Sequence, residues 1–336
     1  MENSIQFWLG IDVSKRKLDV ALLDARGKFR SRSVPNDASG FAQLMKWLQE
    51  RAATPGTCHV CMEATGPYSE ACATSLSDAG WLVSVVNPLR VKGFAQSELL
   101  RNKNDRADAQ LLARFCSKHA PERWVAAPAH VRHLRALVDR LQVLKDMVQQ
   151  ESNRLEALDN DAMLRQSIGE HIQWLKRCMA DLQRQIDDHI DGNPDLREDA
   201  ALMQSIPGLG PVTAAKVLAY LGDVRRFGNA KALAAFLGVT PRQRQSGTSI
   251  NGRTMLSRSG HAAMRTALYM PAVVAMQHNR AVKAFGDRLR SQGMAPKAVI
   301  GACMHKLALL IFGVVRSGKA FDVSLAMPKL DFQDGI

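Results

Sequence analysis

Three strand-like segments follow one another near the N-terminus, with only short polar turns between them. They are Phe7 to Val13, Lys17 to Leu23 and Lys28 to Val34, and each has the composition of a half-buried strand. Strands joined by such short turns pair with their sequence neighbours. The chain therefore starts with a predicted antiparallel meander, which excludes an all-helical N-terminal domain.

Helix and strand signals then alternate up to about residue 118. The first expected elements are a helix from about Gly40 to Glu50, a strand ending in Cys61-Met62-Glu63 and a helix after Pro67. A strand from Trp81 to Val86 and two more helices follow, and the second of these helices runs from about Asp105 to Cys116. A meander followed by this alternation is the order of the ribonuclease-H-like α/β fold, which we predict for residues 1–118. Actin-like kinases share the topology, so the fold alone does not decide the function.

Residues 128–192 have the heptad spacing of long helices. Apolar positions step by three and four in two series, Leu134, Leu137, Leu141, Leu144 and Val148, then Ile168, Ile172, Leu175, Met179, Leu182 and Ile186. A polar break near Asp159-Asn160-Asp161 separates the two series. An antiparallel helical hairpin, a dimerising coiled coil and an ordinary helical bundle all fit this pattern.

Residues 198–328 form a third, mostly helical zone with an unusual distribution of charge. The sixty-three residues from Val224 to Gly286 include ten Lys and Arg but no Asp or Glu. A solvated surface normally mixes both signs, so this segment indicates a phosphate-binding surface. The whole chain has a formal net charge of +13, which also favours a polyanionic partner.

That polyanion is expected to be nucleic acid and not a membrane. No basic stretch followed by an apolar run marks the N-terminus as a secretory signal. The longest apolar helix candidate, about Pro296 to Val315, contains Lys297, His305 and Lys306, which favour a core helix over a membrane span. Cys58-x-x-Cys61 is a lone pair with no second pair at zinc spacing, and we expect buried thiols in a cytoplasmic protein.

Four acidic residues occupy positions that can converge. Asp12 and Glu63 each end an apolar strand, and Asp105 and Asp108 share one face near the start of a helix. Four neighbouring carboxylates repel one another unless cations lie between them, and such oxygen ligands suit Mg²⁺ or Mn²⁺. Two such ions can support phosphoryl transfer.

These residues resemble the motifs of a known family. Gly10-Ile11-Asp12, Glu63-Ala64-Thr65-Gly66, and Arg101-Asn102-Lys103 with Asp105 and Asp108 are similar to those of the RuvC-like DEDD transposases of insertion sequences. The family includes relatives of the Piv DNA invertase and is also called the bridge-RNA-guided serine recombinases. The resemblance spans nearly the whole chain and implies that Asp12, Glu63, Asp105 and Asp108 bind metal.

The resemblance also implies partners and a place of action. Donor DNA and target DNA would be cut and rejoined, with a noncoding guide RNA from the element pairing with both. The acids of the first zone and a serine of the third would form one composite site, within one subunit or between subunits. A homodimer or homotetramer on two DNAs would suit that arrangement, in the bacterial cytoplasm and at the nucleoid.

The serine that this resemblance implies is Ser246, in Gln245-Ser246-Gly247. A serine nucleophile stores the phosphodiester bond as a protein–DNA ester, so rejoining needs no ATP. Three arginines are expected to stabilise the phosphate charge: Arg242, Arg244 and Arg253. From the residues alone, a Ser-Gly pair in a basic loop is more often a turn, and Ser249 stays a rival nucleophile.

Other residues of the third zone are expected to contact DNA without taking part in the chemistry. Ser205 to Ala215 resembles a helix-hairpin-helix turn, in which the backbone N–H groups around Gly208 and Gly210 can meet a phosphate. A plain glycine turn before a helix is an equally good interpretation. Arg258 and Arg265 match a further segment of the family.

Three other functions share part of this pattern. A sugar kinase would share the phosphate motif around Gly10-Ile11-Asp12, but a second glycine-rich phosphate loop is absent from the sequence. A junction-resolving nuclease would use the same four acids with water as the nucleophile and would not need Ser246. A non-catalytic nucleic-acid-binding protein would keep its function after Asp12→Asn.

Overall fold

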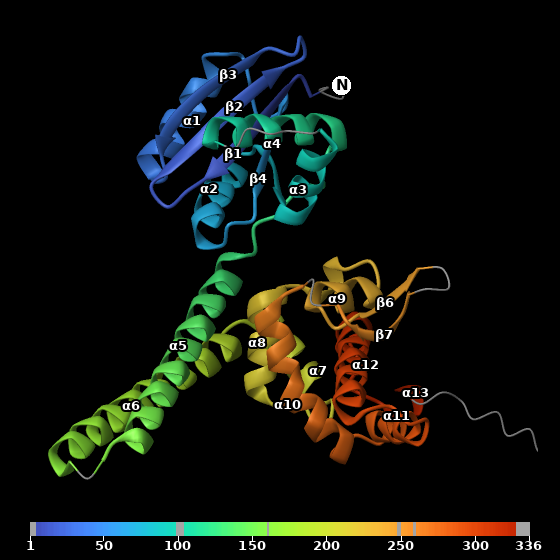
Figure 1. Ribbon diagram of the computed structural model, residues 1–336. Coiled ribbons are helices and arrows are strands. Elements are labelled where there is room, and N and C mark those ends of the chain that lie inside the picture. The colour runs from blue at the N-terminus through green and yellow to red at the C-terminus, as the bar shows by residue number, and fades with distance from the viewer. Residues whose placement is uncertain (1–4, 99–103, 160, 247–249, 258–259, 327–336) are drawn as a thin grey trace, which may run out of the picture. The chain divides into compact units, whose positions relative to one another are not determined.

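The chain forms two compact units, Met1–Ala126 and Ala127–Ile336, each with its own apolar core. The computed structural model describes residues 5–98, 104–159, 161–246, 250–257 and 260–326 (Figure 1). The domain boundaries predicted from the sequence, 1–118, 128–192 and 198–328, stay predictions.

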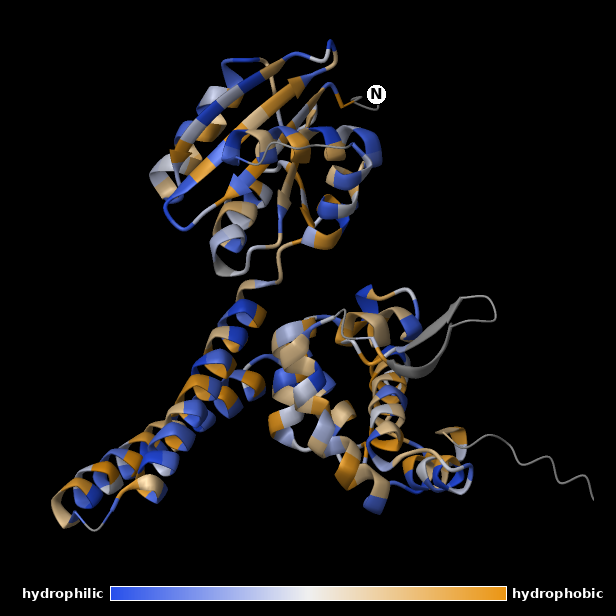
Figure 2. Cartoon of the chain, viewed as in Figure 1, coloured by the Kyte–Doolittle hydropathy of each residue, from blue (hydrophilic) through white to orange (hydrophobic). Residues whose placement is uncertain are grey.

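A five-stranded sheet in the order β3-β2-β1-β4-β5 is the centre of the first unit. Its strands are β1 Phe7–Val13, β2 Lys17–Asp24, β3 Phe29–Pro35, β4 Cys58–Glu63 and β5 Leu82–Val86. β1, β2 and β3 pair antiparallel, whereas β4 lies parallel to both β1 and β5. The predicted meander and the mixed α/β N-terminal domain are confirmed. The central strands are mostly apolar, as buried strands must be (Figure 2).

Helices cover both faces of this sheet. They are α1 Ala38–Gln49, α2 Pro67–Asp78, α3 Pro88–Ser97 and α4 Asp105–His119. Side chains alternate between the faces of a strand, so Leu9 and Ile11 of β1 pack in the core that α1 and α2 share. Trp8 of β1 and Cys61 of β4 pack on the opposite face, with α3 and α4. The four helices occur where the sequence predicts them.

One glycine lets α4 approach the sheet closely. A Cβ on Gly10 of β1 would lie 2.0 Å from the carbonyl oxygen of Ala109 and 2.4 Å from the backbone nitrogen of Ala113. Only a residue without a side chain fits there. The N-terminal turn of α4 is thereby held beside the end of β1.

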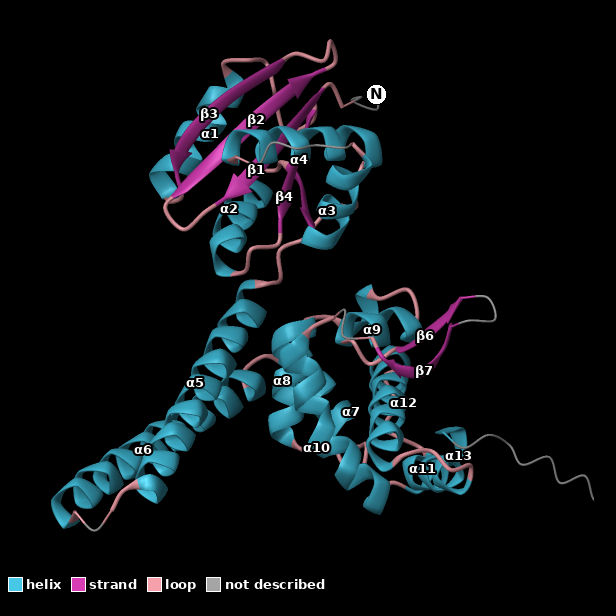
Figure 3. Cartoon of the chain, viewed as in Figure 1, coloured by secondary structure: helices cyan, strands magenta, loops and turns pink. Residues whose placement is uncertain are grey.

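The second unit starts with two long helices, α5 Ala129–Ala157 and α6 Ala162–Asp191, which pack against each other (Figure 3). Leu134 and Leu141 of α5 and Ile186 of α6 belong to the core of the unit. The predicted heptad positions therefore form an intramolecular helix pair. A dimerising coiled coil stays a prediction.

The rest of the second unit is mostly helical. Its elements are α7 Pro194–Gln204, α8 Pro211–Leu221, the short 3-10 helix η1 Val224–Arg226, α9 Ala230–Leu237, β6 Pro241–Ser246, β7 Ile250–Leu256, α10 Ala262–His278, α11 Arg280–Ser291, α12 Pro296–Ser317 and α13 Val323–Ala326. By length and composition α12 is apolar enough to cross a membrane. Its Val299, Leu307 and Ile311 are fully buried in the core, so α12 is the core helix that the sequence predicts.

Candidate active site

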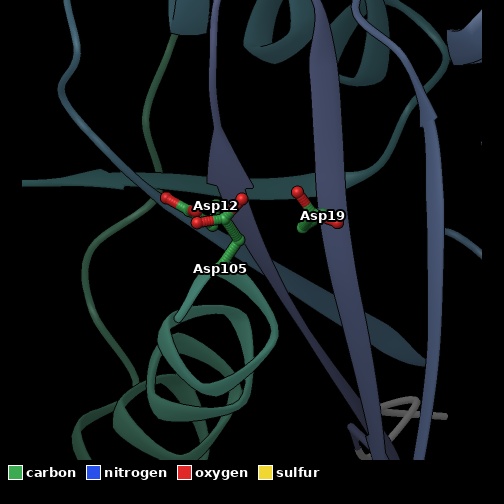
Figure 4. Close-up of side chains that lie close together, drawn as sticks. All are labelled: Asp12, Asp19 and Asp105. Carbon is green, nitrogen blue, oxygen red and sulfur yellow. The ribbon is translucent and has the colours of Figure 1, made fainter. Parts of the chain in front are cut away.

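Three aspartates converge at one end of the first unit. Asp12 is the penultimate residue of β1, Asp19 lies on β2 and Asp105 starts α4 (Figure 4). One carboxylate oxygen from each lies within 4.8 Å of the other two. Within the described residues, these are the acids whose spacing suits a shared metal ion.

The hairpin of β1 and β2 places the first two acids side by side. Asp12 is directly opposite Asp19 in the antiparallel register. The tight turn is closed by Ser14, whose hydroxyl donates to the carbonyl of Lys17 at 2.9 Å. Opposed residues in an antiparallel pair point to the same face of the sheet. Both carboxylates therefore face α4.

The third acid is placed by the start of α4. Asn104 caps this helix, because its side-chain oxygen accepts from the backbone nitrogen of Ala107 at 2.9 Å. Asp105 and Asp108 follow in the first turn, where the helix dipole favours negative charge. Asp105 is exposed and Asp108 is half-buried.

Glu63 is the last residue of β4, the parallel neighbour of β1. The register pairs Ile11 with Met62, so Asp12 and Glu63 each come one residue later on adjacent strands. Glu63 is two residues beyond Cys61, whose side chain packs with α4, and alternation puts both on the same face. Asp12, Glu63, Asp105 and Asp108 thus belong to one face of one unit.

A lysine lies among these acids. The Nζ of Lys17 is 2.7 Å from Asp105 Oδ2 and 2.8 Å from Asp19 Oδ2. These contacts raise the pKa of Lys17 and lower the pKa of Asp105, so both groups are charged at neutral pH. The ammonium group is thus a cation already bound between two of the carboxylates.

Among the converging aspartates, Asp12 is the one whose negative charge is disfavoured by its surroundings. Burial and the negative charges of Asp108, Asp105 and Asp19, in that order, raise its pKa to about 6, and Lys17 opposes the shift. Asp108 acts on Asp12 through its charge, from the first turn of α4. A carboxylate held among other carboxylates is relieved by a divalent cation more effectively than by one lysine.

The donor set fits a hard divalent cation. It consists of carboxylate oxygens, the ligands that Mg²⁺ and Mn²⁺ prefer, and Asp12, Asp19 and Asp105 have the spacing of a shared site. Lys17 shows in addition that the cluster attracts a cation. The acidic cluster is consistent with a divalent metal without identifying the ion.

Asp19 and Lys17 were not among the candidate residues chosen from the sequence. Asp19 lies between Leu18 and Val20 in β2. The side chains of Leu18, Val20 and Leu22 pack on the other face of the sheet. The alternation alone could have placed Asp19 on the face of Asp12, given the short turn between the strands. A contact between Lys17 and Asp105, 88 residues apart, has no such local signal.

The expected serine nucleophile lies in the second unit. Ser246 ends β6 and pairs with Ile250 of β7. Arg242 and Arg244 lie on β6 and Arg253 on β7. The segment expected as a loop is thus a two-stranded hairpin, which the sequence hides because β6 lacks an alternating apolar pattern. The rival Ser249 lies outside the described residues.

The other residues expected to contact DNA differ in how exposed they are. Gly208 has a φ of 106°, and a Cβ there would be 2.8 Å from the Cα of Ala275 in α10, so packing already requires glycine. Gly210 is exposed at the N-terminus of α8, with open space where a Cβ would stand. Arg265 is half-buried on α10, and Arg258 lies outside the described residues.

Comparison with known proteins identifies the family. A transposase family model matches residues 9–162, and a model of the "Transposase IS116/IS110/IS902 family" matches residues 200–287. The chain is 33% identical to the pilin gene-inverting protein of Moraxella bovis, over 94% of this chain and 97% of that protein. It is 28% identical to the transposase for insertion sequence element IS1111A of Coxiella burnetii, over 80% of this chain and 78% of that protein. The chain therefore belongs to the IS110/IS116 family of transposases, whose members include pilin gene-inverting proteins.

Proposed function

We propose that this transposase cuts and rejoins the DNA of an insertion element and its target through a covalent phosphoserine intermediate. The observation that carries the proposal is the convergence of Asp12 and Asp105 on the face to which Glu63 also belongs, within the segment that the transposase model matches. The relatives named for DNA inversion and transposition support recombination over simple hydrolysis.

Asp12, Glu63, Asp105 and Asp108 would hold Mg²⁺, with Mn²⁺ as a substitute. When bound, the metal supplies charge stabilisation to the oxygens that enter and leave phosphorus. The chain itself contributes the alignment of these acids through the β1–β4 register and the close contact of α4 with Gly10.

Ser246 would be the nucleophile. Its Oγ bonds to phosphorus as its proton leaves to water, and the displaced DNA oxygen takes up a proton. A hydroxyl end of a second strand later displaces the serine, so the number of phosphodiester bonds is conserved and no ATP is consumed. Arg242, Arg244 and Arg253, on the same hairpin, would offset the charge on the phosphate.

The acids belong to the first unit and the serine to the second. A composite site would form when DNA brings the two together, within one subunit or between subunits of a homodimer or homotetramer. The basic, acid-free segment Val224–Gly286 would contact phosphates, including through Arg258 and Arg265. The turn at Gly208 and Gly210, which precedes that segment, would contact a further phosphate. We also propose that a noncoding guide RNA reads both DNAs and that the enzyme acts at the bacterial nucleoid.

The test is recovery of protein-linked DNA from cells that carry the intact element. Wild type, Ser246→Ala and Asp12→Asn would be lysed under denaturing conditions and the DNA assayed for attached protein. An adduct that both substitutions abolish supports the proposal. An adduct that survives Ser246→Ala points to Ser249 instead. Cleaved DNA without an adduct, lost in Asp12→Asn, identifies a junction-resolving nuclease.

A further inference from the structure

The ammonium group of Lys17 is bound by the acids that we assign to the metal. It contacts Asp105 at 2.7 Å and Asp19 at 2.8 Å, and both belong to the group of carboxylates that converge on Asp12. We infer that Lys17 is a built-in counter-ion that a divalent metal must displace, and that Asp19 holds this lysine and is not a metal ligand. The inference rests on the proposed function, because it takes Asp12 and Asp105 as ligands.

The two contacts of Lys17 differ in kind. Asp19 is two residues away on the same strand, so both side chains leave β2 on the same face and their contact is local. Asp105 belongs to α4, 88 residues further along the chain. A metal ion that recruits Asp105 to Asp12 breaks the second contact and leaves the first intact. Lys17 then stays at the edge of the site, held by Asp19.

Lys17 is free to make this movement. Its side chain is 49% exposed, compared with 18% for Asp19. The neighbouring side chains Leu18 and Val20 are buried on the opposite face of β2, so moving the lysine disturbs no apolar packing. The cost of displacement is therefore electrostatic: the attraction between the ammonium group and Asp105 must be replaced by that of the metal.

This cost sets the affinity for metal. Lys17 lowers the negative potential of the cluster and occupies an oxygen of Asp105 that the metal needs. Removing the lysine's charge should strengthen binding of a divalent ion about tenfold, since charges a few ångströms apart at a protein surface interact strongly enough for that. The lysine would keep the acids paired at low metal concentration and release them as the concentration rises.

The experiment measures Mn²⁺ binding by the purified full-length chain without DNA. Free Mn²⁺ is followed by its electron paramagnetic resonance signal, after chelator treatment and dialysis. Asp12→Asn identifies the site, because only binding that it removes is counted. Lys17→Met should bind Mn²⁺ about tenfold more tightly than wild type, and Lys17→Arg, which restores the charge, should return to the wild-type value. Equal affinities of Lys17→Met and wild type overturn the inference.

A matched control separates the effect of the Lys17–Asp105 contact from the effect of any positive charge near the acids. Lys15 is exposed on the same turn, so Lys15→Met removes the same charge close by. It should change Mn²⁺ affinity less than threefold. A change as large as that of Lys17→Met would show that only net charge matters and would overturn the counter-ion role.

The role of Asp19 follows from a double-mutant cycle. Asp19→Asn should weaken binding in the presence of Lys17, which then pairs with Asp105 alone. In the Lys17→Met background Asp19→Asn should weaken binding about tenfold at most, which is the electrostatic effect of one lost charge close to the site. A loss of about a hundredfold or more in that background would make Asp19 a metal ligand and overturn this half of the inference. If wild type has no Mn²⁺ binding that Asp12→Asn removes, the proposed metal site itself is wrong.

Discussion

Gly10 and Ala109 are in backbone contact: a Cβ added to Gly10 would lie 2.0 Å from the Ala109 carbonyl oxygen. This contact sets the distance between β1, which carries Asp12 near its end, and α4, which starts with Asp105. Neither Gly10 nor Ala109 can move away easily, because Gly10 lies in the central strand and Ala109 contacts it through the backbone of α4. The stability of the first unit and the geometry of its acids are therefore linked at this glycine.

Gly10→Ala should lower the stability of the first unit by about 2 kcal/mol or more, the usual cost of overpacking a closed core. It should also weaken Mn²⁺ binding, because α4 must move away from β1. Thermal unfolding followed by circular dichroism measures the first effect. Gly93→Ala is the control: Gly93 lies inside α3 with open space around it, so alanine should be neutral or stabilising there. Equal losses in both variants would contradict the prediction.

The raised pKa of Asp12 predicts a pH-dependent stability in the absence of metal. Asp12 binds its proton more tightly in the folded chain, where its pKa is about 6, than in the unfolded chain, where it is near 3.8. Its contribution to stability therefore falls as pH rises from about 4 through about 6, and the penalty is complete above that range. Asp12→Asn removes the penalty.

At pH 8 with chelator present, Asp12→Asn should consequently unfold at a higher temperature than wild type. After allowance for solvent screening of a half-exposed group, the expected gain is about 1 kcal/mol. At pH 4 the difference should vanish. A gain of the same size at both pH values would mean that the charge of Asp12 is not its cause.

The second unit contains an ion pair on which its stability should depend. Asp199 is buried, with only 6% of its surface exposed, and Arg225 donates to both of its carboxylate oxygens at 2.8 and 2.9 Å. Arg225→Met leaves this carboxylate buried without its partner and should cost about 2–4 kcal/mol in urea unfolding. Asp223→Asn removes the weaker, exposed contact of the same arginine and should cost under about 0.5 kcal/mol. Similar costs would contradict the importance of burial.

Gly208 and Gly210 should separate packing from DNA binding. Gly208→Ala strains a residue with φ 106° and clashes with α10, so it should lower the unfolding temperature. Gly210→Ala meets open space and should leave that temperature within about a degree or two. If a phosphate approaches this turn, the added methyl group should still weaken DNA binding severalfold in a fluorescence anisotropy titration. Unchanged DNA binding by Gly210→Ala would remove this turn from the proposed interface.

The N-terminal fold is predictable because its strands pair mostly with near neighbours and because α1, α3 and α4 each start after a capping Asp or Asn. The face of each acid follows from the alternation of side chains along β1 and β4. The hairpin that contains Ser246 was not predictable, since its pairing of Arg242 with Met255 depends on backbone hydrogen bonds and not on an apolar pattern. The ion pair between Lys17 and Asp105 depends on the position of α4 over the sheet. The close contact of α4 with Gly10 fixes that position.

The acids come together in space from opposite ends of the amino-acid sequence of the first unit. Asp12 and Asp19 lie on the first hairpin, whereas Asp105 and Asp108 lie on the last helix of that unit. During translation the ribosome releases the first pair long before the second. Under the proposed chemistry, a growing polypeptide has no complete set of ligands until α4 has emerged and docked. Aborted translation products that stop before residue 104 would therefore be harmless to the genome that encodes them.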